Sequence, residues 1–238
     1  MFLLFKKNLS LQKLVKKVQN PIKMIHELNK TNSIFGTFLA ELRDVSIQKD
    51  SMRFRRNLER ISEIMAYEIS KILPYRAEIV TTPLGQTEVN KLESQPVIAS
   101  ILRAGLPMHI GLLNYFDRAE NAFVSAYRKH TTAEDFEIFV EYMAAPKIDG
   151  KILIISDPML ATGGSMVMVY KALLKQGKPS QIIIAAAIAA PEAITYLRKH
   201  LPDTVKIFVG AIDQELTAQS YIVPGLGDAG DLAYGEKY

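Results

Sequence analysis

The residues with the clearest capacity for chemistry lie in one stretch, Lys151 to Ser165, with the sequence KILIISDPMLATGGS. A carboxylate, Asp157, follows an apolar run, and the small and hydroxylated residues from Ala161 to Ser165 lead into a helical pattern that starts at Met166. A helix start with free backbone N–H groups binds anions such as phosphate, and parallel sheets bind ligands at the carboxyl ends of their strands. A carboxylate at such a strand end can meet sugar hydroxyls or a metal-bound sugar. The stretch therefore predicts a phosphosugar site.

Two arginines stand at the ends of apolar runs that read as strands. Arg103 follows residues 96–102 (PVIASIL) and precedes residues small enough to let the backbone approach a ligand, and Arg128 ends the run 121–127. A guanidinium group can donate two hydrogen bonds to one phosphate, which makes Arg103 a candidate pyrophosphate clamp. A structural ion pair explains Arg103 equally well from this junction alone.

Several other chemistries lack the residues that they need. Cysteine is absent, which excludes a thiolate nucleophile, a disulfide framework and a cysteine-ligated metal. The four histidines show no metal-ligand spacing, and we interpret His130, which lies in a polar stretch, as solvent-facing. Walker A is also missing, because Gly-Lys-Ser/Thr does not occur.

The elements that must position these residues alternate between strands and helices. This alternation predicts an α/β fold with a mainly parallel central sheet flanked by helices. We expect a capped amphipathic helix that follows Asp50-Ser51 and ends before Pro74, and a helix that starts with Pro191 at its first position. The expected strands are 78–82, 96–102, 121–127, 136–143, 152–155, 181–187 and 205–211. The other expected helices are about 108–117 and 166–176. Residues 85–94 are expected to form a polar loop, and 129–135 a loop or a hairpin tip.

Composition and charge limit the class of protein. The chain has 238 residues, of which 48% are hydrophobic, and no Pro/Gly/Ser linker divides it, so one domain is favoured. No apolar run approaches the roughly 18 residues of a membrane span, and we expect a cytoplasmic protein with no membrane partner. The net charge of +4 comes from the first 23 residues, which hold six lysines and no acid. A solvated extension, or a natural start at Met24, is favoured over an arm that binds RNA or an anionic surface.

The C-terminal segment from Tyr221 to Gly235 is rich in glycine. Gly225 to Gly230 satisfies G-x-G-x-x-G, but a dinucleotide fingerprint follows the first strand and opens a helix in a βαβ unit, and no room for one remains here. The exposed backbone groups of such a loop can read the edge of a small planar ligand. Asp228 and Asp231 can add contacts to hydroxyls or to a metal. A turn-rich C-terminal cap is the alternative interpretation.

Three motifs together resemble those of uracil phosphoribosyltransferases, which have the type I phosphoribosyltransferase fold. They are Leu102 to Leu106 (LRAGL), Asp157 to Ser165 (DPMLATGGS) and Tyr221 to Asp231 (YIVPGLGDAGD). The resemblance runs from about Leu28 to the C-terminus. It implies a basic N-terminal extension, 1–27, and a single domain, 28–238, with a small hood built partly from the C-terminal segment.

The resemblance implies transfer of the phosphoribosyl group from phosphoribosyl pyrophosphate (PRPP) to uracil, giving UMP and pyrophosphate in pyrimidine salvage. It assigns ribose and the 5-phosphate to the loop from Asp157 to Ser165, and pyrophosphate to Arg103 and Arg128. The residues implied in PRPP binding are Arg103, Arg128, Asp157, Pro158, Met159, Leu160, Ala161, Thr162, Gly163, Gly164, Ser165 and Asp228. Those implied in uracil binding, largely through the backbone, are Ile222, Gly227, Asp228 and Ala229, and those implied in catalysis are Arg103, Arg128, Asp157 and Asp228.

The resemblance further implies Mg²⁺ held mainly through PRPP, with no direct protein ligand, and a homodimer or larger homo-oligomer. It leaves regulation by GTP open. The sequence departs from the family at His130-Thr131, where two glutamates are usual, and at Leu232 and Tyr234, where a basic residue and a phenylalanine are usual. A regulator or RNA-binding protein on the same fold, and an enzyme for another base, are the alternatives.

Overall fold

The computed structural model describes residues 25–130 and 136–237, with the backbone alone for 127–130 and 136–139. Its main sheet has the strand order β1-β10-β9-β7-β4-β5-β6, with β8 paired to β9. Only β5 and β6 pair antiparallel within this sheet, so the expected mainly parallel α/β fold is confirmed. The strands are β1 (Ile25–Glu27), β4 (Val97–Leu102), β5 (Glu120–His130), β6 (Phe136–Ala144), β7 (Ile152–Ser156), β8 (Met159–Leu160), β9 (Gln181–Ala189) and β10 (Lys206–Ile212).

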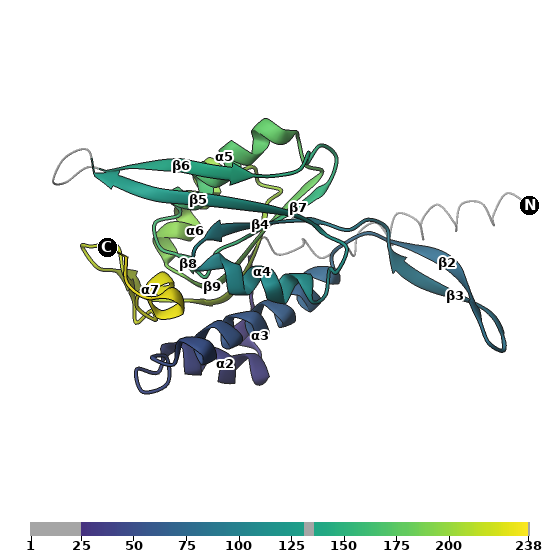
Figure 1. The fold of residues 1–238 in the computed structure, drawn as a ribbon, viewed down its shortest axis with the longest axis horizontal. Coiled ribbons are helices and arrows are strands. Elements are labelled where there is room, and N and C mark those ends of the chain that lie inside the picture. The colour runs from purple at the N-terminus through teal and green to yellow at the C-terminus, as the bar shows by residue number, and fades with distance from the viewer. Residues whose placement is uncertain (1–24, 131–135, 238) are drawn as a thin grey trace, which may run out of the picture.

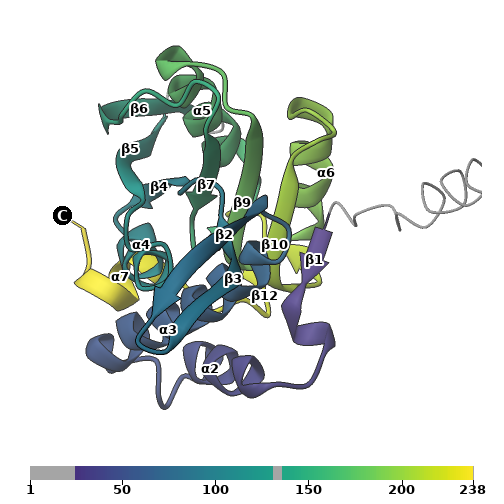
Figure 2. The same ribbon diagram turned by 90° about the vertical axis from the view of Figure 1, so that its right-hand side faces the viewer.

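Helices cover both faces of the sheet (Figures 1 and 2). The central strands are mostly apolar and buried, as a sheet covered on both faces requires, with Ser100 and Ser156 as buried polar exceptions. One face packs against α2 (Ile34–Arg43), α3 (Ser51–Ser70) and α4 (Gly105–Leu113), and the other packs against α5 (Gly164–Leu173) and α6 (Pro191–His200). Short 3-10 helices, η1 (Leu28–Lys30) and η2 (Leu174–Gln176), precede α2 and follow α5.

Local sequence signals explain where the helices start. The Asp50 side chain accepts a hydrogen bond from the Arg53 N–H and caps α3, which confirms the predicted cap, although the helix already includes Ser51. Pro191 occupies the first turn of α6, so this predicted start is confirmed. Helix α5 begins at Gly164 rather than at the predicted Met166. The apolar pattern alone gave the later start, because the first turn consists of small and polar residues.

The order of connections fixes where a ligand can bind. The chain passes from β4 to β5 on one side, and from β7 to β9 and β10 on the other. In doubly wound sheets the ligand crevice lies outside the carboxyl ends of two such diverging strands. Ser100 of β4 lies beside Ser156 of β7, so the loops that start at Arg103 and Asp157 leave the sheet next to each other.

Several segments differ from the sequence predictions: β1, α2 and β8 were not expected, and α4 ends at Leu113 rather than near Asp117. Residues 85–94 are not a polar loop, because β3 (Gly85–Leu92) pairs antiparallel with β2 (Tyr75–Thr82) and the resulting hairpin projects from the body of the molecule (Figure 1). Its side chains are mostly exposed on both faces, so no apolar alternation marks the strand. Near the C-terminus a six-residue helix, α7 (Ala229–Tyr234), forms within the segment that the sequence predicted as a glycine-rich loop or a turn-rich cap.

The C-terminal hood is confirmed as a small unit beside the sheet. It contains the two-residue strands β11 (Glu215–Leu216) and β12 (Ile222–Val223), which pair antiparallel, and helix α7, which packs against α3. At the N-terminus, β1 occupies the last three residues of the range assigned to the basic extension and pairs with β10; the rest of that extension lies outside the described residues. None of the helices within 25–130 and 136–237 is long and apolar enough to cross a membrane.

Candidate active site

A pocket of about 490 Å³ lies at the carboxyl ends of β4 and β7, where the connections diverge. Three parts of the chain form it: the loop after β4, the loop after β7, and the hood. The lining residues are Ile101, Leu102, Arg103, Ala104, Ala126, Asp157, Met159, Leu160, Ala161, Thr162, Gly163, Ser165, Met166, Gln219, Ser220, Tyr221, Asp228, Ala229, Gly230 and Lys237.

Asp157 lies at the start of the loop after β7. Its backbone N–H donates to the Ala185 carbonyl at 3.1 Å, which continues the sheet ladder and holds the residue in place. The carboxylate accepts a long hydrogen bond from the Met159 N–H at 3.4 Å. Burial raises the pKa of Asp157 to about 7, and the Met159 N–H lowers it less than burial raises it. The ionised form therefore gains from a ligand that donates hydrogen bonds or brings a cation.

The same loop ends at the N-terminus of α5. Gly163 has φ +80°, and a Cβ there would lie 3.2 Å from the Ala193 carbonyl oxygen, so a side chain would be strained and crowded. Because Gly163 has no side chain, the N-cap residue does not bind the first N–H groups of α5. The Thr162 hydroxyl accepts a hydrogen bond from the Gly164 N–H at 3.3 Å. The next two residues, Ser165 and Met166, line the pocket at the positive end of the helix dipole. This end of the pocket suits a phosphate group.

Arg103 faces both the pocket and the hood. Its Nη2 donates to Asp231 Oδ1 at 3.0 Å and its Nη1 donates to the Gly235 carbonyl at 3.1 Å. The peptide bond from Leu102 to Arg103 is cis. Arg103 therefore forms the structural ion pair and also lines the pocket, and its role as a pyrophosphate clamp stays a prediction. Its Nε is buried and has no hydrogen-bond partner among the described residues.

The hood brings a carboxylate to the pocket from the opposite side. Asp228 Oδ1 accepts from the N–H groups of Gly230 at 2.8 Å and Asp231 at 3.0 Å, which caps α7. Four polar hood residues that sequence reasoning did not assign also line the pocket: Gln219, Ser220, Tyr221 and Lys237. Tyr221 opens the YIVPGLGDAGD motif, whereas no motif marks Gln219 and Ser220, which precede it, or Lys237, which follows α7.

The structure brings most of the predicted site residues together. Pro158 and Gly164, predicted for PRPP, are not among the lining residues, and neither are Ile222, which is buried, and Gly227, which is exposed. The side chain of Arg128 lies outside the described residues, as do Thr131 and the side chain of His130, so the effect of the missing glutamates stays untested.

A buried polar network lies directly beneath the two loops. The hydroxyls of Ser100 and Ser156 are 2.7 Å apart, Ser100 Oγ is 2.8 Å from His109 Nδ1, and His109 Nε2 is 2.8 Å from Asn121 Oδ1. Because the Asn121 oxygen only accepts, His109 donates from Nε2, and the Ser100 hydroxyl then donates to Nδ1. Burial lowers the pKa of His109, which favours this neutral form. The network ties β4, β7 and α4 together below the site.

A cation fits this pocket if phosphate oxygens supply most of its ligands. Within 25–130 and 136–237, no group of three or more histidine, aspartate or glutamate side chains is placed to hold a metal. Two carboxylates, Asp157 and Asp228, line the pocket. Mg²⁺ is usually bound by one or two carboxylates together with substrate phosphates, which agrees with this donor set.

The fold and the pocket define a class of protein: an α/β domain that binds an anionic ligand where two parallel strands diverge, with a hood over the site. Comparison with known proteins narrows this class. The model of the family described as uracil phosphoribosyltransferase matches residues 30–236. The uracil phosphoribosyltransferase of Porphyromonas gingivalis is 56% identical over 216 residues, which cover 91% of this chain and 100% of that protein. This chain therefore belongs to the uracil phosphoribosyltransferase family and is an enzyme of the phosphoribosyltransferase class.

More distant relatives agree. The uracil phosphoribosyltransferase of Pyrococcus furiosus is 40% identical over 201 residues, which cover 83% of this chain and 84% of that protein. Among solved structures, the AQ2163 protein of Aquifex aeolicus has a TM-score of 0.79 and 32% identity, and the match covers 89% of this chain and 98% of that one.

Proposed function

We propose that this enzyme transfers the phosphoribosyl group from PRPP to N1 of uracil, and so produces UMP and pyrophosphate in pyrimidine salvage. The main support for the proposal is that the Asp157 loop, Arg103 and the hood line the same pocket. The loop from Asp157 to Ser165 binds the ribose and 5-phosphate, Arg103 and Arg128 bind the pyrophosphate, and the backbone of Ile222 and of Gly227 to Ala229 reads the base.

The chemistry requires positioning and charge stabilisation. Breaking the bond at the anomeric carbon leaves positive charge on the ribose and negative charge on the departing pyrophosphate. Arg103 stabilises the leaving group through its guanidinium, while the α5 N-terminus fixes the 5-phosphate. Holding both substrates in one pocket turns a bimolecular step into an intramolecular one, which accounts for much of the rate without a side-chain nucleophile.

Asp157 contributes through its carboxylate. When ionised, it accepts hydrogen bonds from the ribose hydroxyls and stabilises positive charge that develops on the sugar. Bound Mg²⁺ neutralises phosphate charge, and it is held mainly by PRPP. Asp228 approaches from the hood and completes the contacts to PRPP.

We also propose that 28–238 act as one domain in a cytoplasmic homo-oligomer. The cytoplasmic location rests on substrates whose phosphates do not cross a membrane. A second copy is supported by the β2–β3 hairpin, since an isolated two-stranded hairpin is at best marginally stable in water. Tyr75, Ile79 and Leu84 are exposed on it, with Leu84 fully exposed. GTP regulation stays a prediction.

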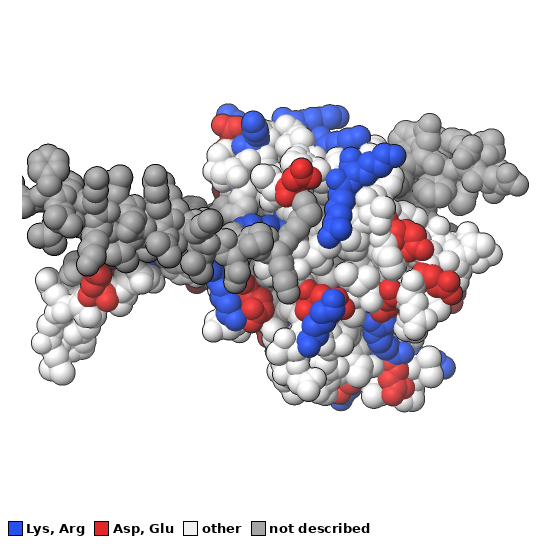
Figure 3. Space-filling view, turned by 180° about the vertical axis from the view of Figure 1, so that it is seen from behind, with Lys and Arg blue, Asp and Glu red and all other residues white. Residues whose placement is uncertain are grey.

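The RNA-binding alternative is weaker. Among the described residues on the face seen in Figure 3, basic and acidic side chains are interspersed rather than gathered into one basic surface. RNA binding that falls steeply with salt and needs the lysines before Met24 would support this alternative.

The direct test incubates the purified protein with PRPP, Mg²⁺ and a panel of bases, and identifies the nucleotide formed. We expect UMP from uracil, and the absence of UMP would contradict the proposal. Replacement of Arg103 by alanine should reduce kcat/KM by about 10²–10³-fold, the range found when one charge-stabilising donor is removed. Arg118→Ala is a matched control, because Arg118 is exposed and lies outside the pocket. Unchanged kinetics in Arg103→Ala would remove Arg103 from the site.

A further inference from the structure

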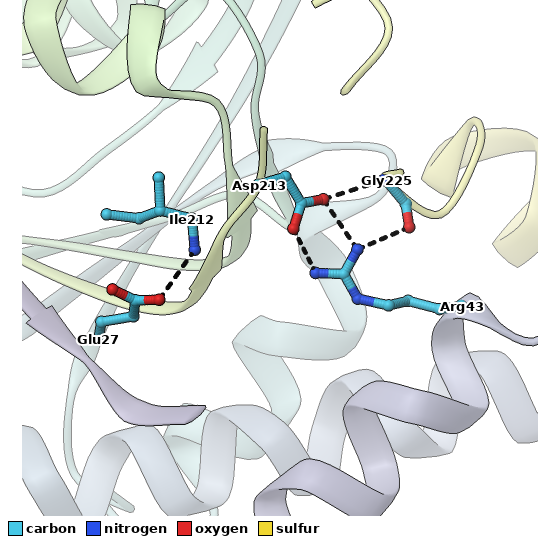
Figure 4. Close-up of polar contacts among 5 residues, drawn as sticks. All are labelled: Glu27, Arg43, Ile212, Asp213 and Gly225. Atoms are coloured by element: carbon cyan, nitrogen blue, oxygen red, sulfur yellow. Dashed lines mark hydrogen bonds and ion pairs between the residues drawn. The ribbon is translucent and has the colours of Figure 1, made fainter. Parts of the chain in front are cut away.

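An ion pair outside the pocket holds the loop that leads to the base site (Figure 4). Arg43, the last residue of α2, donates from Nη2 to Asp213 Oδ1 at 2.6 Å and from Nη1 to Asp213 Oδ2 at 2.8 Å. Asp213 directly follows β10, and 170 residues of sequence separate the two side chains. Neither residue lines the pocket.

The same pair binds both polar groups of one residue in the hood. Arg43 Nη1 donates to the Gly225 carbonyl at 2.8 Å, and the Gly225 N–H donates to Asp213 Oδ2 at 2.9 Å. Asp213 is only 5% exposed and Arg43 only 22%. Charge-assisted hydrogen bonds in such a shielded place are stronger than neutral ones, and the bidentate geometry fixes direction as well as distance. Gly225 is therefore held in position and orientation.

The neighbouring backbone has little freedom. Gly225 has φ +61°, and a Cβ there would lie 2.0 Å from the Ile222 carbonyl oxygen, so the turn is tightly closed. Gln48 Nε2 donates to the Leu226 carbonyl at 3.1 Å, and the Gln214 N–H donates to the Val223 carbonyl at 3.0 Å. These bonds occupy the carbonyls of 223, 225 and 226 outside the pocket. In the segment from Gly227 to Ala229, the Asp228 carbonyl accepts from the Leu232 N–H at 3.0 Å, so the other backbone groups are the candidates to face a ligand.

We propose that Arg43, acting with Asp213, is a positioning residue for uracil recognition. The pair sets the place of Gly225, and only two residues separate Gly225 from Asp228, which lines the pocket. A displacement of Gly225 therefore passes directly to the segment that reads the base. Glu27 fixes the other side of the same strand end, since its Oε1 accepts from the Ile212 N–H at 3.4 Å.

If Arg43 positions the base site, its replacement should change KM for uracil more than KM for PRPP. PRPP is bound mainly by the loops after β4 and β7, which the sheet and the Ser100–Ser156 network hold independently of Arg43. The proposed binding of uracil depends on the backbone of the hood. The inference rests on the proposed function, because it assumes that this backbone reads uracil.

The test compares Arg43→Met, Arg43→Lys and Arg56→Ala with the unaltered enzyme, in the full-length chain. Methionine keeps an unbranched apolar side chain but removes the guanidinium charge. Lysine keeps the positive charge but cannot donate two parallel hydrogen bonds to one carboxylate. Arg56→Ala is the matched control, since Arg56 forms an ion pair with Glu59 on the exposed side of α3. KM for uracil, KM for PRPP, kcat and the melting temperature are measured for each.

We expect Arg43→Met to raise KM for uracil about 10–100-fold, the effect of losing a charge-assisted hydrogen bond. KM for PRPP should change by less than about threefold, with Arg43→Lys intermediate and Arg56→Ala unchanged. Adding Asp213→Asn to Arg43→Met should raise KM for uracil little further, because the two residues act as one unit. If Arg43→Met does not fold, Arg43→Lys carries the test.

Three results would count against these proposals. Unchanged KM for uracil in Arg43→Lys and Arg43→Met would overturn the positioning role, and so would equal increases in both KM values. Either outcome leaves the proposed function intact, since the unaltered enzyme still forms UMP. An unaltered enzyme that forms no UMP would overturn the proposed function, and the inference with it.

Discussion

Replacement of Asp157 by asparagine should stabilise the protein while removing most of its activity. The carboxylate is buried at the base of the pocket and has one long hydrogen bond, from the Met159 N–H. Its pKa is about 7 in the folded protein and has the ordinary value of 3.8 in an unfolded chain. Asparagine has nearly the same shape and no charge to desolvate. It can still accept the Met159 hydrogen bond, but it cannot stabilise positive charge on the ribose.

The stabilisation depends on pH in a defined direction. Below about pH 4 the carboxyl is protonated in both states and Asp157 is neutral, so the substitution has little effect. Between about pH 4 and 7 the unfolded chain has released a proton that the folded protein still binds, so the free energy of unfolding falls as the pH rises. The asparagine variant has no carboxyl at this position, so its free energy of unfolding does not fall in this way. Its advantage over the unaltered protein should therefore grow up to about pH 7 and then stay constant.

The size of the advantage follows from the difference between the two pKa values. A difference of about three units at about 1.36 kcal/mol per unit sets an upper limit near 4 kcal/mol. The pocket is open to solvent, which screens the charge, so we expect about 1–3 kcal/mol above pH 7. For a protein of this size that corresponds to a rise in melting temperature of about 3–10 °C.

The assay is thermal unfolding at pH 4, 5.5, 7 and 8 without ligands, combined with kcat/KM for PRPP. Asp203→Asn is the control, because Asp203 is exposed in the turn after α6. The reasoning is wrong if Asp157→Asn is less stable than the unaltered protein at pH 8, or if its gain does not change between pH 4 and 8. Full activity in this variant would remove Asp157 from the catalytic residues.

Three further outcomes are expected. The proposed role of Asp157 requires its ionised carboxylate to bind PRPP, so kcat/KM for PRPP should rise with pH through about 7. A profile that is flat from about pH 5.5 to 8.5 would contradict this role. Gly225→Ala should raise KM for uracil and lower the free energy of unfolding by about 1–3 kcal/mol, because the added Cβ would clash with the Ile222 carbonyl oxygen. A titration with uracil measures the first effect, and a titration with denaturant measures the second. Gly111→Ala should lower the free energy of unfolding by about 1–3 kcal/mol and leave both KM values unchanged, because a Cβ there would lie 2.0 Å from Ser62 Oγ where α4 packs against α3. A denaturant titration that matches the unaltered protein would contradict this prediction.

The sequence predicted the sheet and its main helices well because buried elements leave a strong pattern. Strands β4, β7 and β9 are almost entirely apolar, because helices cover both faces of the sheet. Strand β3 has no such pattern, because it is exposed and carries polar residues on both faces. Helix α7 is too short for periodicity to appear, and its start depends on the Asp228 cap.

Site residues were predictable where one short stretch of chain contains them. The loop from Asp157 to Ser165 is such a stretch, because strand, turn and helix start follow one another. The partners of Arg103 were not predictable, since Asp231 and Gly235 reach it only when the hood folds over β4. The same holds for Arg43 and Asp213, whose contact depends on the relative placement of α2 and β10.

The two partners of Arg103 have a consequence for turnover. A guanidinium group that already binds Asp231 and the Gly235 carbonyl must exchange these contacts for pyrophosphate oxygens. The net affinity for pyrophosphate is then the difference between two interactions, rather than the full strength of one. Moderate affinity for the leaving group favours release of the product, and the returning contact with Asp231 competes for the arginine as pyrophosphate departs. In its proposed role, Arg103 would thus hold pyrophosphate during transfer without retaining it afterwards.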